Sequence, residues 1–442
     1  MSRLFPPHLL RLVLMSWLAL LACFSQSFAQ THDQGKIFGG YFEEWGVNYA
    51  GYNIADLQKN GVADELTHLI YAFGNVTPTS PATCAIADPV AAYQNANVPS
   101  VSGKPYTAPL YGNFGAIQQL KELHPNLKVL ISLGGQAGNV GGFVTAAAAA
   151  AGREALASSC IDMFVKGNIA PGVTAPGLFD GFNIDWEFPG APDKQNFTAL
   201  LKEFRTQLNA LSKTTGKKYV LTFDSPANPR KYINIDLKAA AAQVDFLTID
   251  GYDYAAPDEK QTNESSSLYD TSADPVYADD RYIDATVKAY LKAGVPPAKY
   301  TMGLPLYAVG WTGVPNVNHG LYQNATGPAP VPLADGSGLC AKPDKANPSP
   351  SCDTVLTAGF ATYSTIQNLT KYGYTSWYDS TRAGATLYNP STGTFYTYDN
   401  PAAAATKLAY IKKHKLGGAY VWALNDDDAS AALTKVIAAG LK

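Results

Sequence analysis

The sequence predicts an α/β fold, a (β/α)8 TIM barrel with a small α+β insertion subdomain between its seventh and eighth strands. Two observations support this fold class: eight short apolar runs recur along the chain, and helical stretches separate most of them. Strands that alternate with helices form a parallel sheet, and eight strands close a barrel. An open doubly wound sheet is less well supported, because no G-x-G-x-x-G motif follows the first apolar run.

The predicted elements follow one another in a regular order. Strands are expected at residues 36–42, 66–73, 128–135, 179–187, 218–225, 244–252, 300–307 and 417–424. Helices between them are expected at 113–124, 196–211 and 400–415. The last helix has Pro401 in its first turn and Gly417 after its end, which are the usual start and stop signals.

One interval interrupts the alternation of strands and helices. More than 100 residues separate the seventh predicted strand from the eighth. The first part of the interval is rich in proline, and the last part alternates like β-strands joined by turns. We therefore expect an inserted α+β subdomain at 312–390, beside the mouth of a catalytic barrel that spans residues 30–442.

The composition and the N-terminus indicate an exported protein. The net charge is -3 and only 16% of the residues are charged, so we expect no nucleic-acid partner and no attraction to an acidic membrane. Arg3 and Arg11 precede an apolar run at 12–23, and small residues follow at Ser27 and Ala29. This pattern predicts a signal peptide at 1–29, a secreted protein and no membrane association after cleavage. The alternative is a lipid anchor at Cys23.

Four cysteines remain after the predicted cleavage, at Cys84, Cys160, Cys340 and Cys352. An even number in an exported chain suggests disulfides. Cys340 and Cys352 close a short loop and form the favoured pair, which leaves Cys84 with Cys160 by elimination. No histidine lies near these cysteines at ligand spacing, so we expect neither a metal nor another cofactor.

The segment "FDGFNIDWE" at 179–187 combines a strand pattern with acidic residues. Successive side chains of a strand point to opposite faces, so Asn183, Asp185 and Glu187 share one face and the apolar residues between them share the other. The polar face then points into the barrel, and Glu187 lies at the C-terminal end of the strand, where barrel enzymes hold their active sites. A solvated strand edge explains the segment less well, because aromatic residues flank the acids on both sides.

The segment "DGFNIDWE" resembles the D-G-x-D-x-D-x-E signature of family 18 glycoside hydrolases, the chitinases. Other segments resemble further motifs of that family in the same order, namely "YFEEWGVNY" (41–49), "IYAF" (70–73), "ISLGG" (131–135), "GYD" (251–253), "LYAVGWTGV" (306–314) and "GGAYVWAL" (417–424). The resemblance covers nearly all of the chain after residue 29, including the expected insertion.

The resemblance implies a catalytic role for three residues. Glu187 would be the general acid that protonates the glycosidic oxygen. The 2-acetamido oxygen of the substrate would attack C1, giving an oxazolinium ion and net retention, so no second carboxylate acts as nucleophile. Asp185 would hold the acetamido N–H, and Tyr252 would hydrogen-bond the acetamido oxygen.

The resemblance also implies a set of substrate-binding residues. Trp422 would form the floor under the distorted sugar, and Asp253 would support the same region. The full set is Asn183, Asp253, Trp422, Tyr41, Phe73, Trp45, Asp250, Gln136 and Tyr307. Taken singly, Tyr252 and Trp422 are better explained as core residues, and Trp45 as a loop residue that packs locally. Their assignment depends on the shared register with Glu187.

Four positions depart from the family pattern. Asn183 occupies the place of the second Asp of the signature, Asp250 replaces a usual Met, Gln136 replaces a common Trp, and Val309 replaces a common Arg. At the first of these, we expect the side-chain N–H of Asn183 to donate a hydrogen bond to Asp185 and to lower its pKa.

The leading functional hypothesis is a secreted, monomeric chitinase that cuts β-1,4-linked N-acetylglucosamine in chitin or chito-oligosaccharides. One alternative is a catalytically silent chitin-binding lectin on the same barrel. A third is an endo-β-N-acetylglucosaminidase that acts on glycoprotein glycans.

Overall fold

The structure is a computed structural model that describes residues 35–49, 51–136, 140–340 and 357–442. Three expectations fall outside these residues: the signal peptide at 1–29, the lipid anchor at Cys23 and the Cys340–Cys352 disulfide, whose second cysteine is not described.

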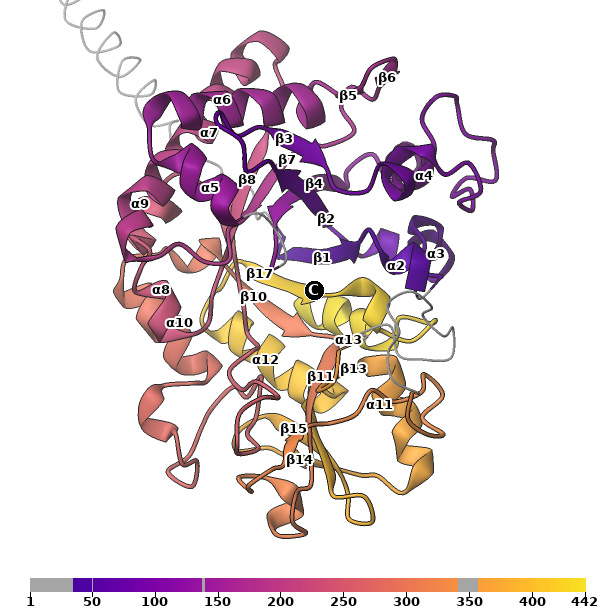
Figure 1. Cartoon of the computed structure of the whole chain (residues 1–442), viewed down its shortest axis with the longest axis vertical. Coiled ribbons are helices and arrows are strands. Elements are labelled where there is room, and N and C mark those ends of the chain that lie inside the picture. The colour runs from indigo at the N-terminus through magenta and orange to yellow at the C-terminus, as the bar shows by residue number, and fades with distance from the viewer. Residues whose placement is uncertain (1–34, 50, 137–139, 341–356) are drawn as a thin grey trace, which may run out of the picture. The chain divides into compact units, whose positions relative to one another are not determined.

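Eight parallel strands form a closed barrel, which confirms the predicted fold class (Figure 1). They are β1 (Ile37–Glu43), β2 (His68–Val76), β4 (Lys128–Gly134), β7 (Gly181–Asp185), β8 (Val220–Ser225), β9 (Phe246–Ile249), β10 (Tyr300–Pro305) and β17 (Gly418–Trp422). Each strand pairs with the next in this order, and β1 closes the ring because it pairs with both β2 and β17. Every one of the eight predicted strands overlaps one of these.

Helices connect the barrel strands and cover their outer faces. The helices are α2 (Gly46–Tyr49), α3 (Ile54–Lys59), α4 (Gly112–Leu123), α5 (Val140–Ala147), α6 (Ala150–Cys160), α7 (Lys194–Thr215), α8 (Pro229–Tyr232), α9 (Leu237–Ala241), α10 (Ile283–Lys292), α11 (Tyr363–Leu369), α12 (Pro401–Lys413) and α13 (Ala432–Leu441). The three helices expected from the sequence are α4, α7 and α12. The side chain of Asn400 caps α12 by accepting a hydrogen bond from the backbone N–H of Ala403 at 2.9 Å.

A second, antiparallel sheet lies between β10 and β17 in the chain and contains the inserted residues (Figure 1). Its strands are β11 (Tyr307–Thr312), β12 (Gly327–Pro328), β13 (Phe360–Thr362), β14 (Thr375–Asp379), β15 (Gly384–Asn389) and β16 (Thr394–Tyr398). With α11 it makes up the expected α+β insertion. The first of these strands begins before residue 312 and the last ends after residue 390. The bounds 312–390 of a separate subdomain therefore remain a prediction.

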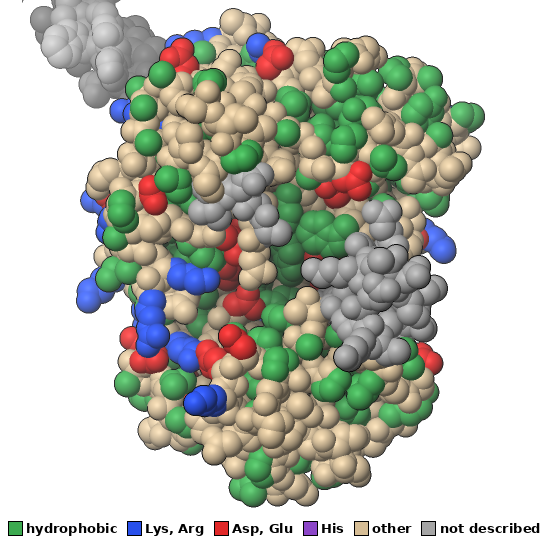
Figure 2. Space-filling model, in the orientation of Figure 1, with side chains coloured by type: hydrophobic (Ala, Val, Ile, Leu, Met, Phe, Trp, Pro, Cys, Tyr) green, Lys and Arg blue, Asp and Glu red, His purple; other side chains and the backbone are tan. Residues whose placement is uncertain are grey.

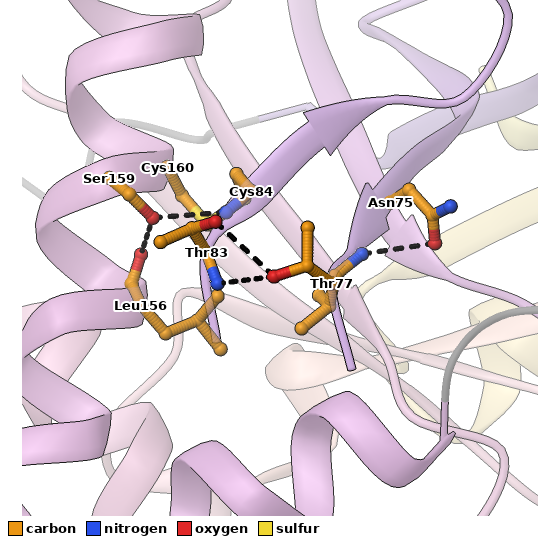
Figure 3. Close-up of a disulfide and its surroundings, with 8 residues drawn as sticks. Asn75, Thr77, Thr83, Cys84, Leu156, Ser159 and Cys160 are labelled. Atoms are coloured by element: carbon orange, nitrogen blue, oxygen red, sulfur yellow. Dashed lines mark hydrogen bonds between the residues drawn. A yellow bond between two sulfur atoms is a disulfide. The ribbon is translucent and has the colours of Figure 1, made fainter. Parts of the chain in front are cut away.

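A disulfide joins Cys84 to Cys160, which confirms the pair expected by elimination (Figure 3). It links β3 (Cys84–Ile86), a short strand beside β2, to the last residue of α6. The Oγ of Ser159 accepts a hydrogen bond from the backbone N–H of Cys84 at 3.0 Å and donates one to the carbonyl of Leu156 at 2.9 Å. A further short hairpin is formed by β5 (Asn168–Ala170) and β6 (Val173–Thr174).

Across the described ranges, no helix combines the length and the apolar character that crossing a membrane requires.

Candidate active site

Strand β7 places its apolar and polar side chains on opposite faces, as the sequence predicts. Phe182 and Ile184 are fully buried in the core outside the barrel, and the Phe182 ring lies 5.3 Å from that of Phe204 on α7. Asn183 and Asp185 are buried on the inner face, with exposed fractions of 0% and 3%. The polar residues of "FDGFNIDWE" are thus held inside the barrel.

A cavity of about 570 Å³ opens at the C-terminal ends of the barrel strands. Figure 2 shows this face hollowed across its middle, with acidic and hydrophobic side chains gathered in the hollow. Eleven of the twelve residues expected at the site line the cavity, namely Tyr41, Trp45, Phe73, Gln136, Asp185, Glu187, Asp250, Tyr252, Asp253, Tyr307 and Trp422. The twelfth, Asn183, lies beneath them and is hydrogen-bonded to Tyr41.

Two glycines of "ISLGG" allow β2, β4 and β7 to meet at the cavity. Gly134 has a φ of 119°, and a Cβ there would lie 2.0 Å from the carbonyl oxygen of Asp185. A Cβ on Gly135 would lie 2.5 Å from the ring of Phe73. The backbone N–H of Gly135 instead donates to the Asp185 carbonyl at 2.9 Å, which fixes the end of β7.

Glu187 is a half-buried acid on the cavity wall, directly after β7. Burial, followed by the negative charge of Asp253, raises the pKa of Glu187 to about 7. The positive charge of Lys231 opposes this shift, and the Lys231 Nζ lies 4.3 Å from the ring centroid of Phe188. A carboxyl group with such a pKa is protonated for part of the time near neutral pH, as a general acid requires.

Asp185 lies deeper than Glu187. Burial raises the pKa of Asp185 well above its ordinary value, and the charges of Glu187 and Asp250 add to this effect. Its Oδ1 atom is buried and has no hydrogen-bond partner among the described residues. A buried polar atom without a partner is costly, so this oxygen is available to a donor from a bound molecule or a neighbouring group.

Asn183 does not donate to Asp185, so the expectation from the sequence is wrong. Its Oδ1 accepts hydrogen bonds from Ser132 Oγ at 2.7 Å and Tyr41 Oη at 3.0 Å, and its Nδ2 donates to Thr248 Oγ1 at 3.2 Å. The pKa of Asp185 is raised rather than lowered. The physical reason is that the Asn183 amide hydrogen-bonds side chains on other strands of the barrel. It therefore does not stabilise a charged Asp185.

Tyr252 and Asp250 follow β9 and belong to one hydrogen-bonded group. The hydroxyl of Tyr252 donates to that of Tyr420 at 3.4 Å, and the hydroxyl of Tyr420 donates to Asp250 Oδ1 at 3.0 Å. Burial, together with the charges of Asp253 and Glu187, raises the pKa of Asp250.

Asp253 and Tyr307 connect the barrel with the second sheet. The Tyr307 hydroxyl on β11 donates to Asp253 Oδ1 at 2.5 Å. The carboxylate of Asp253 is accessible through the open cavity, yet the surrounding walls raise its pKa, and the hydrogen bond from Tyr307 opposes this. The second sheet therefore provides one side of the site.

Four aromatic side chains form a continuous row along the cavity. The rings of Trp45 and Phe73 stack with centroids 5.8 Å apart, and those of Phe73 and Trp422 stack at the same distance. Tyr41 continues the row, 5.1 Å from Trp422. Trp45 therefore lies in line with the other aromatic residues of the cavity, rather than being an isolated loop residue.

Sequence reasoning missed several residues of the lining, namely Glu43, Phe188, Asp224, Lys231, Phe360 and Asp426. Asp224 had a usable signal, because it is a carboxylate inside the apolar strand "VLTFDS", where it alternates with Leu221 and Phe223. Glu43 ends β1, one residue beyond the predicted strand 36–42, and the other four lie in segments whose sequence gave no periodic pattern.

Two residues of the motifs that resemble the family, Asp180 and Val309, lie outside the cavity. Asp180, the first acid of the signature, forms an ion pair with Lys121 at 2.8 Å and accepts the backbone N–H of Val129 at 2.9 Å, which ties β7 to β4. Val309 is buried in the second sheet between Phe360 and Thr397 and does not line the cavity. Within the described ranges, no three His, Cys, Asp or Glu side chains are arranged to hold a metal ion.

Comparisons with known proteins agree on one family. The model described as "Glycosyl hydrolases family 18" matches residues 37–427. Chitinase A1 of Niallia circulans is 32% identical over 438 residues, covering 90% of this chain and 57% of that protein. Chitinase A of Pseudoalteromonas piscicida is 26% identical over 453 residues, covering 89% of this chain and 51% of that protein. The present chain thus spans just over half the length of these two relatives.

A similar fold is found among solved structures. The catalytic domain of psychrophilic chitinase B from Arthrobacter TAD20 superposes with a TM-score of 0.79 at 33% sequence identity. The match covers 92% of this chain and 95% of that structure.

Proposed function

Because the chain belongs to glycosyl hydrolases family 18, we propose that it is a secreted chitinase that hydrolyses β-1,4-linked N-acetylglucosamine polymers. One observation carries most of the proposal: Glu187, an acid whose pKa is raised to about 7, lies above the buried Asp185 at the open end of the barrel. The names of the relatives described above agree with this substrate, and the sequence pattern at 1–29 supports secretion.

In the proposed reaction, Glu187 acts first as a general acid. It gives its proton to the glycosidic oxygen as the bond between that oxygen and C1 breaks. Help of this kind contributes roughly 10²–10⁴-fold to a rate. The walls that bury Glu187 keep the proton on it at a pH where an exposed glutamate would have lost it.

The nucleophile in this proposal is the substrate itself. Its 2-acetamido oxygen forms a bond to C1, which gives a positively charged oxazolinium ion. Asp185, whose buried Oδ1 lacks a partner in the described chain, accepts the acetamido N–H and offsets the positive charge. Water then gives a proton to Glu187 and attacks C1, and the bond between C1 and the acetamido oxygen breaks, so the product keeps the configuration of the substrate.

The other side chains of the cavity orient the sugar. Tyr252 lines the cavity, and in this proposal its hydroxyl proton turns from Tyr420, whose oxygen is 3.4 Å away, to the acetamido oxygen. Trp422 offers an aromatic face as a floor, and the row from Trp422 to Trp45 provides surface for further sugars of a polymer.

The decisive experiment compares three substrates with the purified protein. We expect release of chromophore from a chromogenic chitobioside and shortening of chitin oligosaccharides, with glycans on a glycoprotein left intact. Binding of oligosaccharides without any turnover would indicate the lectin instead. Release of glycans from the glycoprotein, with chitin oligosaccharides untouched, would indicate the endo-β-N-acetylglucosaminidase.

A further inference from the structure

Asp224 is an acid of the barrel interior that the proposed mechanism does not use. It lies on β8, lines the cavity and is only 7% exposed. Burying a carboxyl group is costly unless a partner or a proton compensates for the loss of water. The position of Asp224 therefore calls for a physical explanation.

The strand register makes Asp224 the neighbour of Asp185. On the paired strands β7 and β8, Ile184 lies opposite Phe223. The next residue along each strand is Asp185 on one and Asp224 on the other, and both line the same cavity. Because adjacent strands lie roughly 4.8 Å apart, the two carboxyl groups are within reach of each other.

A chain of hydrogen bonds connects Asn183 with Asp224. Asn183 Nδ2 donates to Thr248 Oγ1 at 3.2 Å, and Thr248 Oγ1 donates to Asp224 Oδ1 at 3.2 Å. Asn183 stands where the family signature has an acid, and its polar contacts lead to an acid on the neighbouring strand. The second carboxyl group beside Asp185 is thus present in this chain, but on β8.

The surroundings of Asp224 favour its neutral form. Burial raises its pKa well above the ordinary value, and the charges of Asp250, Asp185 and Glu187 act in the same direction, whereas the hydrogen bond from Thr248 opposes them. The other titratable groups facing this part of the barrel are Tyr41 on β1, Tyr252 after β9, Tyr290 on α10 and Tyr420 on β17. Lys231, the one lysine among the described residues that line the cavity, acts on Glu187 and Asp253.

We propose that Asp224 is a positioning residue whose protonated carboxyl group donates a hydrogen bond to Asp185, and so replaces from β8 the partner that Asn183 does not provide. The acceptor is the buried Oδ1 of Asp185, which has no partner among the described residues. A carboxylate oxygen has two lone pairs, so Oδ1 can accept this bond beside the one from the acetamido N–H of the substrate. The bond favours the ionised form of Asp185, which the positive oxazolinium ion needs beside it. No proton leaves Asp224 during the reaction. The inference rests on the proposed function.

Two substitutions of Asp224 test whether its role depends on a hydrogen-bond donor or only on the size of the side chain. Asp224→Asn keeps an N–H donor, and we expect kcat within about threefold of the wild type and an unchanged acid limb of kcat/KM. Asp224→Leu has no donor, so the ionised form of Asp185 loses support and its pKa rises. We expect kcat to fall about tenfold or more with little change in KM, and the acid limb to move up by about one pH unit. These pH–rate profiles are measured on one soluble chitin oligosaccharide.

The matched control is Thr222→Val on the same strand. Thr222 is fully buried and inward-facing, and its Oγ1 has no hydrogen-bond partner among the described residues. Its removal should leave the pH profile unchanged.

Three results would overturn the inference. Equal profiles for the Asn and Leu variants would show that no donor is needed. An acid limb that moves to lower pH in Asp224→Asn would show that the wild-type residue carries a charge. The third is an infrared difference spectrum, wild type minus Asp224→Asn at working pH, that lacks the carbonyl band of a protonated carboxyl group.

The spectrum shows whether Asp224 is protonated even if the Leu variant does not fold. If the wild type cleaved no oligosaccharide, the proposed function would fail instead, and the spectrum would still report on Asp224.

Discussion

Seven of the described side chains that line the cavity are Asp or Glu. Burial is the largest cause of the raised pKa at Glu187, Asp185, Asp224 and Asp250. These acids differ in depth and in neighbours. Glu187 is near the opening and has the positive charge of Lys231 close by, so its pKa is raised to about 7. The deeper acids are surrounded by one another, and burial together with these charges raises the pKa of each. Such differences allow acids in one pocket to take different roles.

Replacing Glu187 with Gln should remove general acid catalysis and leave the shape of the cavity intact. We expect kcat to fall by roughly 10²–10⁴-fold while oligosaccharides still bind. In the wild type, the activity should fall as pH rises through about 7, because Glu187 must be protonated to act. Steady-state kinetics across pH and calorimetric binding of an oligosaccharide measure both effects. A variant that keeps a tenth of the wild-type kcat would exclude Glu187 from this role.

At the scale of single residues, the sequence predicted which side chains line the cavity better than it predicted their hydrogen-bond partners. Glu187, Asp185 and Tyr252 could be named because a strand alternates its faces and because the motifs share a register. The partners of Asn183 could not be foreseen, since Ser132, Tyr41 and Thr248 reach it from three other strands that only the closed barrel brings together. Asp224 likewise lies on a different strand from Asp185, so the sequence could not predict that they are neighbours.

At the scale of elements, each barrel strand was visible as an apolar run because both of its faces are covered, one by helices and one by the barrel interior. The second sheet was harder to delimit. Its strand β11 begins at Tyr307, two residues after β10 ends at Pro305, so the sequence 300–307 reads as one apolar run although it belongs to two sheets. In this sheet β11 also pairs with β13 and β16, which are not its neighbours in the chain, and no local pattern reveals these two pairings.

The Cys84–Cys160 disulfide fixes β3 to α6 across a sequence separation of 76 residues. Replacing both cysteines with Ala should lower the free energy of unfolding by about 2–4 kcal/mol, because the unfolded chain gains freedom. A lower thermal midpoint measures this loss, and kcat should change little since neither cysteine lines the cavity. The control compares the wild type and the double variant after both are treated with a reductant, when the two should melt alike. Equal midpoints for oxidised wild type and variant would show that the bond does not stabilise the fold.

At the scale of the whole described chain, two sheets cooperate to form one site. The barrel supplies the acids from the ends of β7, β8 and β9, and the second sheet adds Tyr307 and Phe360 to the wall. The hydrogen bond from Tyr307 to Asp253 joins them directly. A wall beyond the barrel deepens the cavity, as suits a substrate that is a chain of sugars rather than a single one.

In the proposed reaction the acetamido group of the substrate is the nucleophile, and cleavage of partially N-acetylated chitosan reports on this step. In this polymer, some sugars carry the acetamido group and others a free amine. Mass spectrometry of the products identifies the sugar at each newly formed reducing end, which is the sugar that occupied the site of attack. We expect this sugar always to be N-acetylglucosamine, because a free amine has no oxygen that can attack C1. Abundant products with glucosamine at the new reducing end would show that the acetamido group is not the nucleophile.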